Sequence, residues 1–233
     1  EQLLNWLDLE GRNKPTFLAS YFSIVDPIGH RYGPNSSEVI DSIIEVDEAI
    51  GHLLNGLEER GILNDVNLLI VSDHGMVETP ADQIINIADY IDLDSVVTIG
   101  GGPFMEIRPN DNDIENIYQQ LQNIDHTQVF KKEDFPEKFN YSNNDRIEPI
   151  IFLADEGWSI QKPGRSPSPG SHGYDPDYKS MDGIFIARGP GFKENFDGPQ
   201  IQSIHLYEMM CHLMEIVPAQ NDGSLAETEV FLR

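Results

Sequence analysis

Carboxylate and imidazole side chains gather in three short glycine-containing segments. These are residues 26–30 (Asp-Pro-Ile-Gly-His), 73–76 (Asp-His-Gly-Met) and 171–175 (Ser-His-Gly-Tyr-Asp). The first two follow the apolar runs Phe17–Val25 and Val66–Val71. An apolar run that ends in Asp is typical of a buried parallel strand, which delivers the carboxylate at the edge where α/β sheets build their sites. Convergence of the five side chains would form a metal site for two ions, and such a pair most often cleaves phosphate esters. The five are Asp26, His30, Asp73, His74 and His172.

The number of ligands indicates an incomplete site. A catalytic zinc ion takes three protein ligands and keeps one position open. Asp26, His30 and His172 would complete one such set. Asp73 and His74 supply only two ligands for a second ion, and no nucleophile is evident. The sequence therefore predicts part of a metal site.

Each segment also has a purely structural interpretation. Asp26 followed by Pro27 is a good helix start, with Asp as N-cap and Pro at the first helical position. His30 would then lie one turn later, a spacing that also suits two ligands of one ion. Asp73 can bond backbone N–H groups in a turn, with His74 on the surface. A lone loop histidine such as His172 is usually solvated, and only the other two segments favour a role for it as a ligand.

A βαβ unit is expected to position the first two segments. Thr16–Val25 and Val66–Val71 have the β-branched and apolar composition of strands. Between them, apolar residues recur at helical spacing from Ile40 to Leu57, after possible N-caps at residues 35–37 and before a glycine that ends the helix. A right-handed crossover would return the chain so that both strands end at one edge of the sheet. The two carboxylates would then be neighbours.

The rest of the chain is less regular, particularly over residues 100–160. We expect a closing helix over Ser203–Val217 and a loop without core-forming residues over Lys162–Ser171. Further strands are expected at Val96–Ile99, Phe104–Arg108, Gln128–Lys131 and Gly183–Arg188, a helix at Asp113–Asn123, and a hairpin of Pro149–Leu153 with Trp158–Gln161. The predicted fold is a single α/β domain over residues 1–233, with a mostly parallel central sheet flanked by helices and an insert-like region at about residues 100–160.

Composition limits the classes of partner. Of 233 residues, 39% are apolar, which is enough for one large core. No apolar run approaches the length of a membrane span. The 15 Lys and Arg against 40 Asp and Glu give a net charge of −25, which argues against binding of a nucleic-acid polymer. The same charge would repel a small anionic substrate, so a phosphate site needs local positive charge, which metal ions supply. The single cysteine, Cys211, excludes an intrachain disulfide framework.

In their longer context the three segments resemble a known family. Tyr21–Pro34, Val71–Met76 and Gly170–Asp175 resemble the nucleotide pyrophosphatase/phosphodiesterase family, the type I phosphodiesterases of the alkaline phosphatase superfamily. Further stretches look like the C-terminal half of that family's domain, namely residues 145–150, 154–158, 181–193 and 206–223. The resemblance covers nearly the whole chain in the family's order.

The resemblance implies an alkaline phosphatase-like fold and two zinc ions. Asp26, His30 and His172 match the ligands of one zinc, and Asp73 and His74 match two ligands of the other. The remaining ligand and a Thr or Ser nucleophile are expected upstream of residue 1, so this chain would be the C-terminal half of a larger catalytic domain and the missing N-terminal half its partner. The implied substrate is a small phosphodiester or nucleotide, and the implied location is periplasmic or extracellular.

Three functions remain open from the sequence. The first is metal-dependent hydrolysis of phosphodiester or pyrophosphate bonds. The second is the chemistry of a superfamily cousin that acts on a phosphonate, a sulfate ester or a phosphomonoester. The third is a fragment that binds metal without catalysis, which the lack of a nucleophile favours for this chain taken alone.

Overall fold

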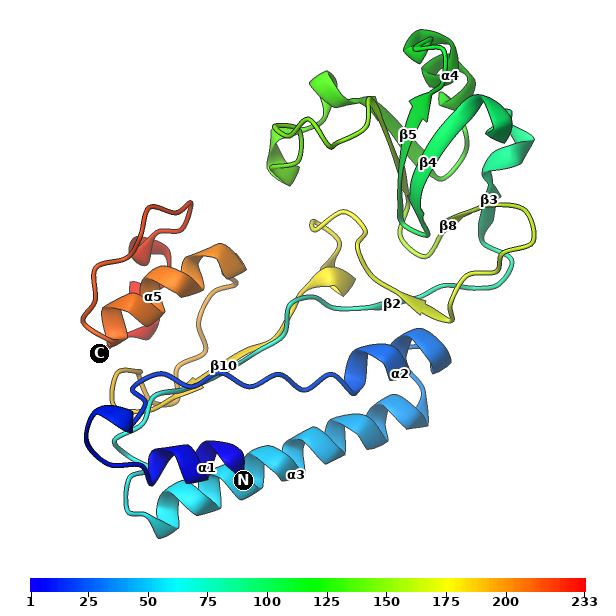
Figure 1. Cartoon of the computed structure of the whole chain (residues 1–233). Helices are drawn as coiled ribbons and strands as arrows, with labels where there is room; N and C mark the ends of the chain where they lie inside the picture. The colour runs from blue at the N-terminus through cyan, green and yellow to red at the C-terminus, as the bar shows by residue number, and fades with distance from the viewer. The chain divides into compact units, whose positions relative to one another are not determined.

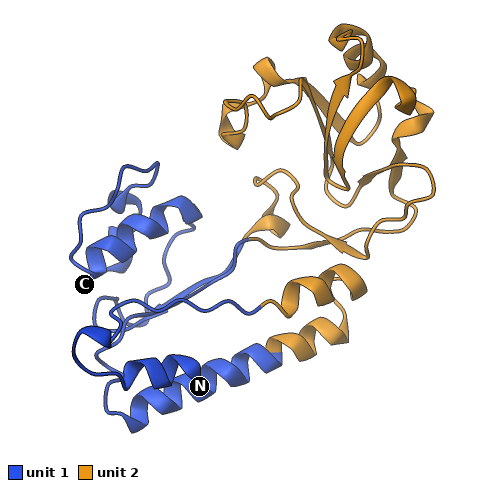
Figure 2. Cartoon of the chain, viewed as in Figure 1, with its two compact units in different colours: residues 1–22, 44–73, 183–233 blue, residues 23–43, 74–182 orange.

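The chain folds into two compact units. A computed structural model describes all of residues 1–233. Residues 1–22, 44–73 and 183–233 form unit 1, and residues 23–43 and 74–182 form unit 2, as Figure 2 shows. The prediction of one α/β domain with an insert stays a prediction.

Unit 1 contains helices α1 (Gln2–Leu7) and α5 (Leu206–Leu213) and the antiparallel pair β1 (Leu68–Val71) and β10 (Phe185–Arg188) (Figure 1). Helix α3 (Ser37–Glu59) contributes its residues from 44 onward to this unit. The core residues of the unit are buried side chains from its C-terminal segment, namely Phe192, Met209, Phe231 and Leu232.

No helix in the structure has both the length and the apolar character needed to cross a membrane.

Glycine ends helix α3 as the sequence predicts. Gly61 has φ +67°, in the left-handed region that favours glycine. Its N–H donates to the Glu58 carbonyl at 2.8 Å, and the Ile62 N–H donates to the Leu57 carbonyl at 3.0 Å. This pair of bonds is a Schellman motif, which satisfies carbonyls that the end of a helix would otherwise leave unpaired.

A four-stranded antiparallel sheet forms the centre of unit 2. Its order is β4 (Val96–Gly101), β5 (Phe104–Pro109), β7 (Ile150–Ala154) and β6 (Thr127–Lys131). Both faces are covered, because all five residues of β7 are buried. One face carries Phe152 and Met105 and packs in a cluster with Leu121 of helix α4 (Ile114–Leu121). The other face carries Ile151 and Leu153 and lies under Phe135.

Unit 2 also contains two smaller strand pairs, helix α2 and the first residues of helix α3, up to residue 43. Strand β2 (Val77–Glu78) pairs antiparallel with β9 (Gly170–Ser171), and β3 (Ile84–Asn86) pairs parallel with β8 (Ser159–Gln161). Helix α2 spans Val25–Tyr32. The predicted mixture of helix and sheet is confirmed, while parallel pairing is seen only between β3 and β8.

The predicted strand over Thr16–Val25 is wrong. Residues 16–23 lie in neither a helix nor a strand, and α2 begins at Val25. Strand conformation is stabilised by ladder hydrogen bonds to a neighbour, and no strand of this chain pairs with the segment. Its apolar side chains stay exposed, as at Phe17 (54%) and Tyr21 (74%). The expected βαβ unit is therefore not formed, and β1 pairs antiparallel with β10.

The predicted hairpin around residues 154–157 is also wrong. Both strands exist, as β7 and β8, but they do not pair with each other. Strand β7 lies between β5 and β6, so both of its edges are already hydrogen-bonded, and β8 pairs with β3 instead.

We expect the central sheet of unit 2 to depend on Phe152, whose side chain is fully buried. Phe152→Ala should lower the free energy of unfolding by about 3–5 kcal/mol, because it leaves a cavity in a close-packed core. The matched control Ile99→Ala changes a side chain that is 47% exposed on β4 and should lower it by less than about 1 kcal/mol. Urea unfolding curves of the two variants would contradict the assignment of the core if their losses were equal.

Candidate metal centre

Helix α2 places Asp26 and His30 on one face. Residues four apart on a helix are neighbours, and His30 Nε2 lies 3.5 Å from Asp26 Oδ1. A helix does begin in this segment, but the predicted N-cap is wrong: the N-cap is Ile24, and Asp26 and Pro27 both lie in the first turn. A carboxylate there is favoured by the helix dipole. The helix ends at Gly33, whose N–H donates to the Gly29 carbonyl at 2.9 Å.

Strand β9 brings His172 to the same place. Its two residues pair with β2, Ser171 opposite Val77 and Gly170 opposite Glu78, and His172 follows directly. His172 Nε2 lies 3.4 Å from Asp26 Oδ1. The metal-binding atoms of Asp26, His30 and His172 all lie within 4.8 Å of one another.

Close packing of glycines allows this meeting. A Cβ at Gly170 would lie 2.3 Å from the backbone oxygen of Gly29, a distance that atoms do not adopt. Because Gly170 has no side chain, β9 can approach the backbone of α2, while the space that a Cβ of Gly29 would need is taken by the Met76 sulfur. Sequence reasoning missed this role, although a glycine one or two positions before each of these histidines was a visible signal.

Two histidines have fixed tautomers. The Nδ1 of His30 lies 2.8 Å from the Gly170 carbonyl oxygen, and the Nδ1 of His74 lies 2.8 Å from the Gly75 carbonyl oxygen. A carbonyl only accepts, so each Nδ1 donates its proton. In the neutral imidazole, Nε2 then carries a lone pair, which is the usual preparation of a histidine for a metal ion.

His74 joins the group from the segment before β2. Its ring stacks on that of His172 with centroids 3.5 Å apart and planes 12° apart, and its Nε2 lies 4.0 Å from Asp26 Oδ1.

Asp26 Oδ1 is at the centre of the group. It is buried from water and has no hydrogen-bond partner. The Nε2 atoms of His30, His172 and His74 lie 3.5, 3.4 and 4.0 Å from it. The lone pairs of a carboxylate and of neutral imidazoles repel one another at these distances, and a positive charge between them would remove the repulsion. These donors fit a metal ion such as zinc, which binds imidazole nitrogen and carboxylate oxygen.

The fifth predicted ligand, Asp73, is the last residue of segment 44–73, which belongs to unit 1. The structure therefore brings together four of the five predicted side chains within unit 2, and the assignment of Asp73 with His74 to a second ion stays a prediction.

A hollow opens next to His172. Its volume is about 290 Å³, and it begins at Gly173. Rings of Phe104, Phe139 and Tyr141 are among its walls. Burial raises the pKa of Tyr141 to about 12, helped by the bond that its hydroxyl donates to Glu106 at 2.7 Å. The hydroxyl therefore stays neutral at physiological pH, and the hollow offers aromatic faces close in sequence to His172.

Comparison with known proteins gives consistent matches. Residues 1–175 match the family model described as type I phosphodiesterase/nucleotide pyrophosphatase. Human bis(5'-adenosyl)-triphosphatase ENPP4 is 37% identical over 227 residues, which cover 96% of this chain and 50% of that protein. The venom phosphodiesterase CdcPDE of Crotalus durissus collilineatus is 36% identical over 234 residues, which cover 96% of this chain and 28% of that protein. The chain thus spans half or less of the length of these relatives.

Solved structures confirm the predicted alkaline phosphatase-like fold. Murine ectonucleotide pyrophosphatase/phosphodiesterase 5 matches with a TM-score of 0.93 and 32% identity, over 100% of this chain and 62% of that one. The same murine protein, inactive through a threonine-to-alanine substitution, is also known in complex with AMP, with the same TM-score and coverage.

Gly170→Ala should weaken zinc binding by more than about tenfold, because the added methyl group forces β9 away from α2 and separates His172 from His30. Competition with a chromophoric chelator measures the affinity. Gly51→Ala is the matched control, since a Cβ there meets no atom within 4 Å, and it should leave the affinity unchanged. Equal affinities for the two variants would contradict the role given to the glycine contact.

Proposed function

The chain belongs to the type I phosphodiesterase/nucleotide pyrophosphatase family, and from this premise we propose that it carries most of a two-zinc centre that hydrolyses phosphodiester or pyrophosphate bonds. The substrates would be nucleotides or related small molecules. The observation that carries this proposal is the buried Asp26 Oδ1, without a hydrogen-bond partner and surrounded by three imidazole nitrogens.

The proposed ligands fall into two sets. Asp26, His30 and His172 would hold one ion, and Asp73 and His74 would contribute to the other. When bound, such an ion pair supplies positive charge and Lewis acidity for in-line displacement at phosphorus. The protein contributes the orientation of its ligands: the Gly170 and Gly75 carbonyls hold the rings of His30 and His74, so that Nε2 faces the centre.

The nucleophile is proposed to be a Thr or Ser outside these 233 residues, in the N-terminal half of the same catalytic domain. Support comes from the murine relative, which is inactive when a threonine is replaced by alanine. The remaining ligand of the second ion would come from the same half.

Charge and shape favour a small substrate. The net charge of −25 opposes an extended polyanion, whereas two divalent ions offset the charge of one phosphate group locally. The aromatic hollow, lined in part by Gly173 directly after His172, offers ring faces to the organic part of a small molecule. The murine relative binds AMP, and the human relative is named for a dinucleoside triphosphate, which supports nucleotides as the class.

A periplasmic or extracellular location is proposed as well. It is supported by the names of the relatives, which include an ectonucleotide pyrophosphatase/phosphodiesterase and a venom phosphodiesterase.

Asp26→Asn should weaken zinc binding by more than about tenfold, because the amide removes the charge at the centre of the ligand group. In a protein completed with the N-terminal half of its domain, the same change and a chelator should each abolish hydrolysis of bis-p-nitrophenyl phosphate. Asp125→Asn, at an exposed residue of unit 2, serves as the matched control.

Equal hydrolysis with and without the chelator would contradict the metal mechanism. Zinc binding without phosphodiester hydrolysis, but with cleavage of a sulfate ester, a phosphonate or a phosphomonoester, would favour the chemistry of a superfamily cousin. Zinc binding without any hydrolysis by the completed protein would favour the non-catalytic alternative.

A further inference from the structure

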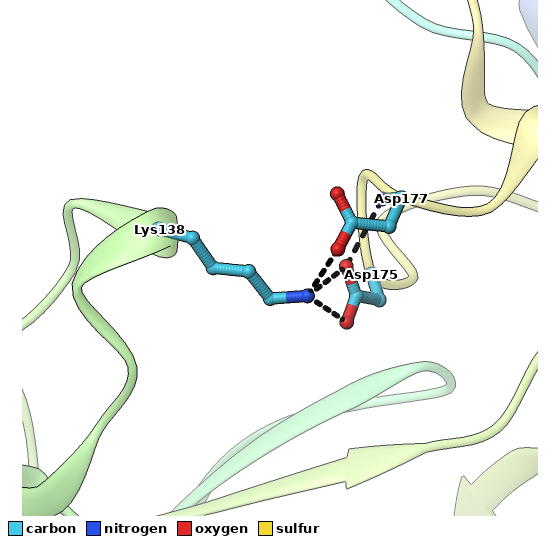
Figure 3. Close-up of polar contacts among 3 residues, drawn as sticks. All are labelled: Lys138, Asp175 and Asp177. Atoms are coloured by element: carbon cyan, nitrogen blue, oxygen red, sulfur yellow. Dashed lines mark hydrogen bonds and ion pairs between the residues drawn. The ribbon is translucent and has the colours of Figure 1, made fainter.

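A lysine and two aspartates form a compact ion-pair group beside the segment that carries His172. Lys138 Nζ lies 2.7 and 2.9 Å from the two carboxylate oxygens of Asp175 and 2.6 Å from Asp177 Oδ2, as Figure 3 shows. Asp175 is three residues beyond His172. We propose that Lys138 is a positioning residue for His172, which fixes the C-terminal side of this segment and thereby strengthens zinc binding. The inference rests on the proposed function.

The N-terminal side of the segment is held by backbone bonds. Strand β9 pairs with β2, and the Thr79 N–H donates to the Pro169 carbonyl at 2.9 Å. His30 adds its bond to the Gly170 carbonyl. This side of His172 therefore needs no help from Lys138.

The C-terminal side has two anchors. Tyr174 is buried, and its hydroxyl donates to the Trp158 carbonyl at 2.9 Å. The second anchor is Asp175, whose side chain is only 17% exposed and accepts both from Lys138 and from the Asp177 N–H at 3.0 Å. Gly173 lies between His172 and these anchors and has φ +93°, in the region that favours glycine; a residue without a side chain restricts its backbone little. The two anchors together limit this freedom of the backbone.

Lys138 itself stands on a rigid support. It belongs to the short 3₁₀ helix Glu137–Phe139, and the Phe139 ring stacks on Phe135 at 4.7 Å. Phe135 is buried in the cluster with Ile151 and Leu153 of β7. Lys138 Nζ also lies 4.9 Å from the Phe139 ring centroid, which is a cation–π distance. The ammonium is thus connected through packed rings to the central sheet.

The charges explain why a cation is needed at this position. Three carboxylate oxygens converge on one ammonium, and without it Asp175 and Asp177 would repel each other. The bonds to both aspartates raise the pKa of Lys138, so the side chain stays charged at neutral pH. Exposed ion pairs are weak individually, and Lys138 is 42% exposed, so the expected effect on zinc affinity is moderate.

The test measures zinc affinity of the whole chain by chelator competition, together with the visible spectrum of the Co²⁺-loaded protein. Lys138→Met should weaken zinc binding about three- to tenfold, less than the roughly 10- to 100-fold loss typical of direct partners of metal ligands, because Lys138 acts on His172 only through the backbone. It should also lower the Co²⁺ band intensity, because a loosened His172 gives way to water. Lys138→Arg should restore both values. Lys131→Met, which breaks the ion pair of Lys131 with Glu115 elsewhere in unit 2, is the matched control and should change neither.

A double-mutant cycle separates positioning from general damage. Asp175→Asn alone should also weaken binding, and the double variant should lose less than the sum of the two single losses, because both changes break the ion pair between Lys138 and Asp175. Additive losses of zinc affinity in the double variant would overturn the role of Lys138 while leaving the metal centre intact. Wild-type zinc affinity with an unchanged Co²⁺ spectrum in Lys138→Met would do the same. If circular dichroism shows that Lys138→Met does not fold, zinc affinity is compared instead between Asp175→Asn alone and Asp175→Asn combined with Lys138→Arg. Asp175→Asn should weaken zinc binding, and adding Lys138→Arg should weaken it no further. A wild-type chain that binds no zinc would overturn both this inference and the proposed function.

Discussion

A carboxylate oxygen that is shielded from water and accepts no hydrogen bond carries a large free-energy penalty unless positive charge lies next to it. Asp26 Oδ1 is in this position, between the Nε2 atoms of His30, His172 and His74. The Nδ1 protons of His30 and His74 are already donated to carbonyls, so these rings in their neutral form offer only lone pairs. A cation satisfies the oxygen and the nitrogens at once. The rest of unit 2 can be understood as the means of holding these four groups in place.

That support is built from elements with little regular structure of their own. An eight-residue helix carries Asp26 and His30, and a two-residue strand precedes His172. The helix and the strand meet where Gly170 lies against the Gly29 backbone. The four-stranded antiparallel sheet packs against Phe135 and Phe139, the rings next to Lys138. Precision at the centre therefore derives from packing around short segments rather than from long elements. A substitution next to one of these short segments is therefore expected to alter metal affinity without unfolding the four-stranded sheet.

Local patterns predicted more than long-range pairing did. The structure shows several features that follow from residue types within a few positions. These are the i, i+4 spacing of Asp26 and His30, the helix that ends at Gly61 and most of the short strands. The predicted strand over Thr16–Val25 and the hairpin around residues 154–157 failed because a strand is defined by its partner. The composition of a segment does not say whether a partner exists or whether its edges are already occupied, as they are for β7. The approach of Gly29 to Gly170 was hidden for the same reason.

The bond from His30 to the Gly170 carbonyl joins residues 140 positions apart. A zinc ion held by Asp26, His30 and His172 would bridge the same distance and act as a cross-link, in a chain whose single cysteine cannot form one internally. Closing so long a loop restricts the unfolded chain strongly, as a disulfide of similar span would. Unlike a disulfide, this cross-link would form only when free metal is available. The lifetime of the folded protein would therefore depend on the concentration of free zinc around it.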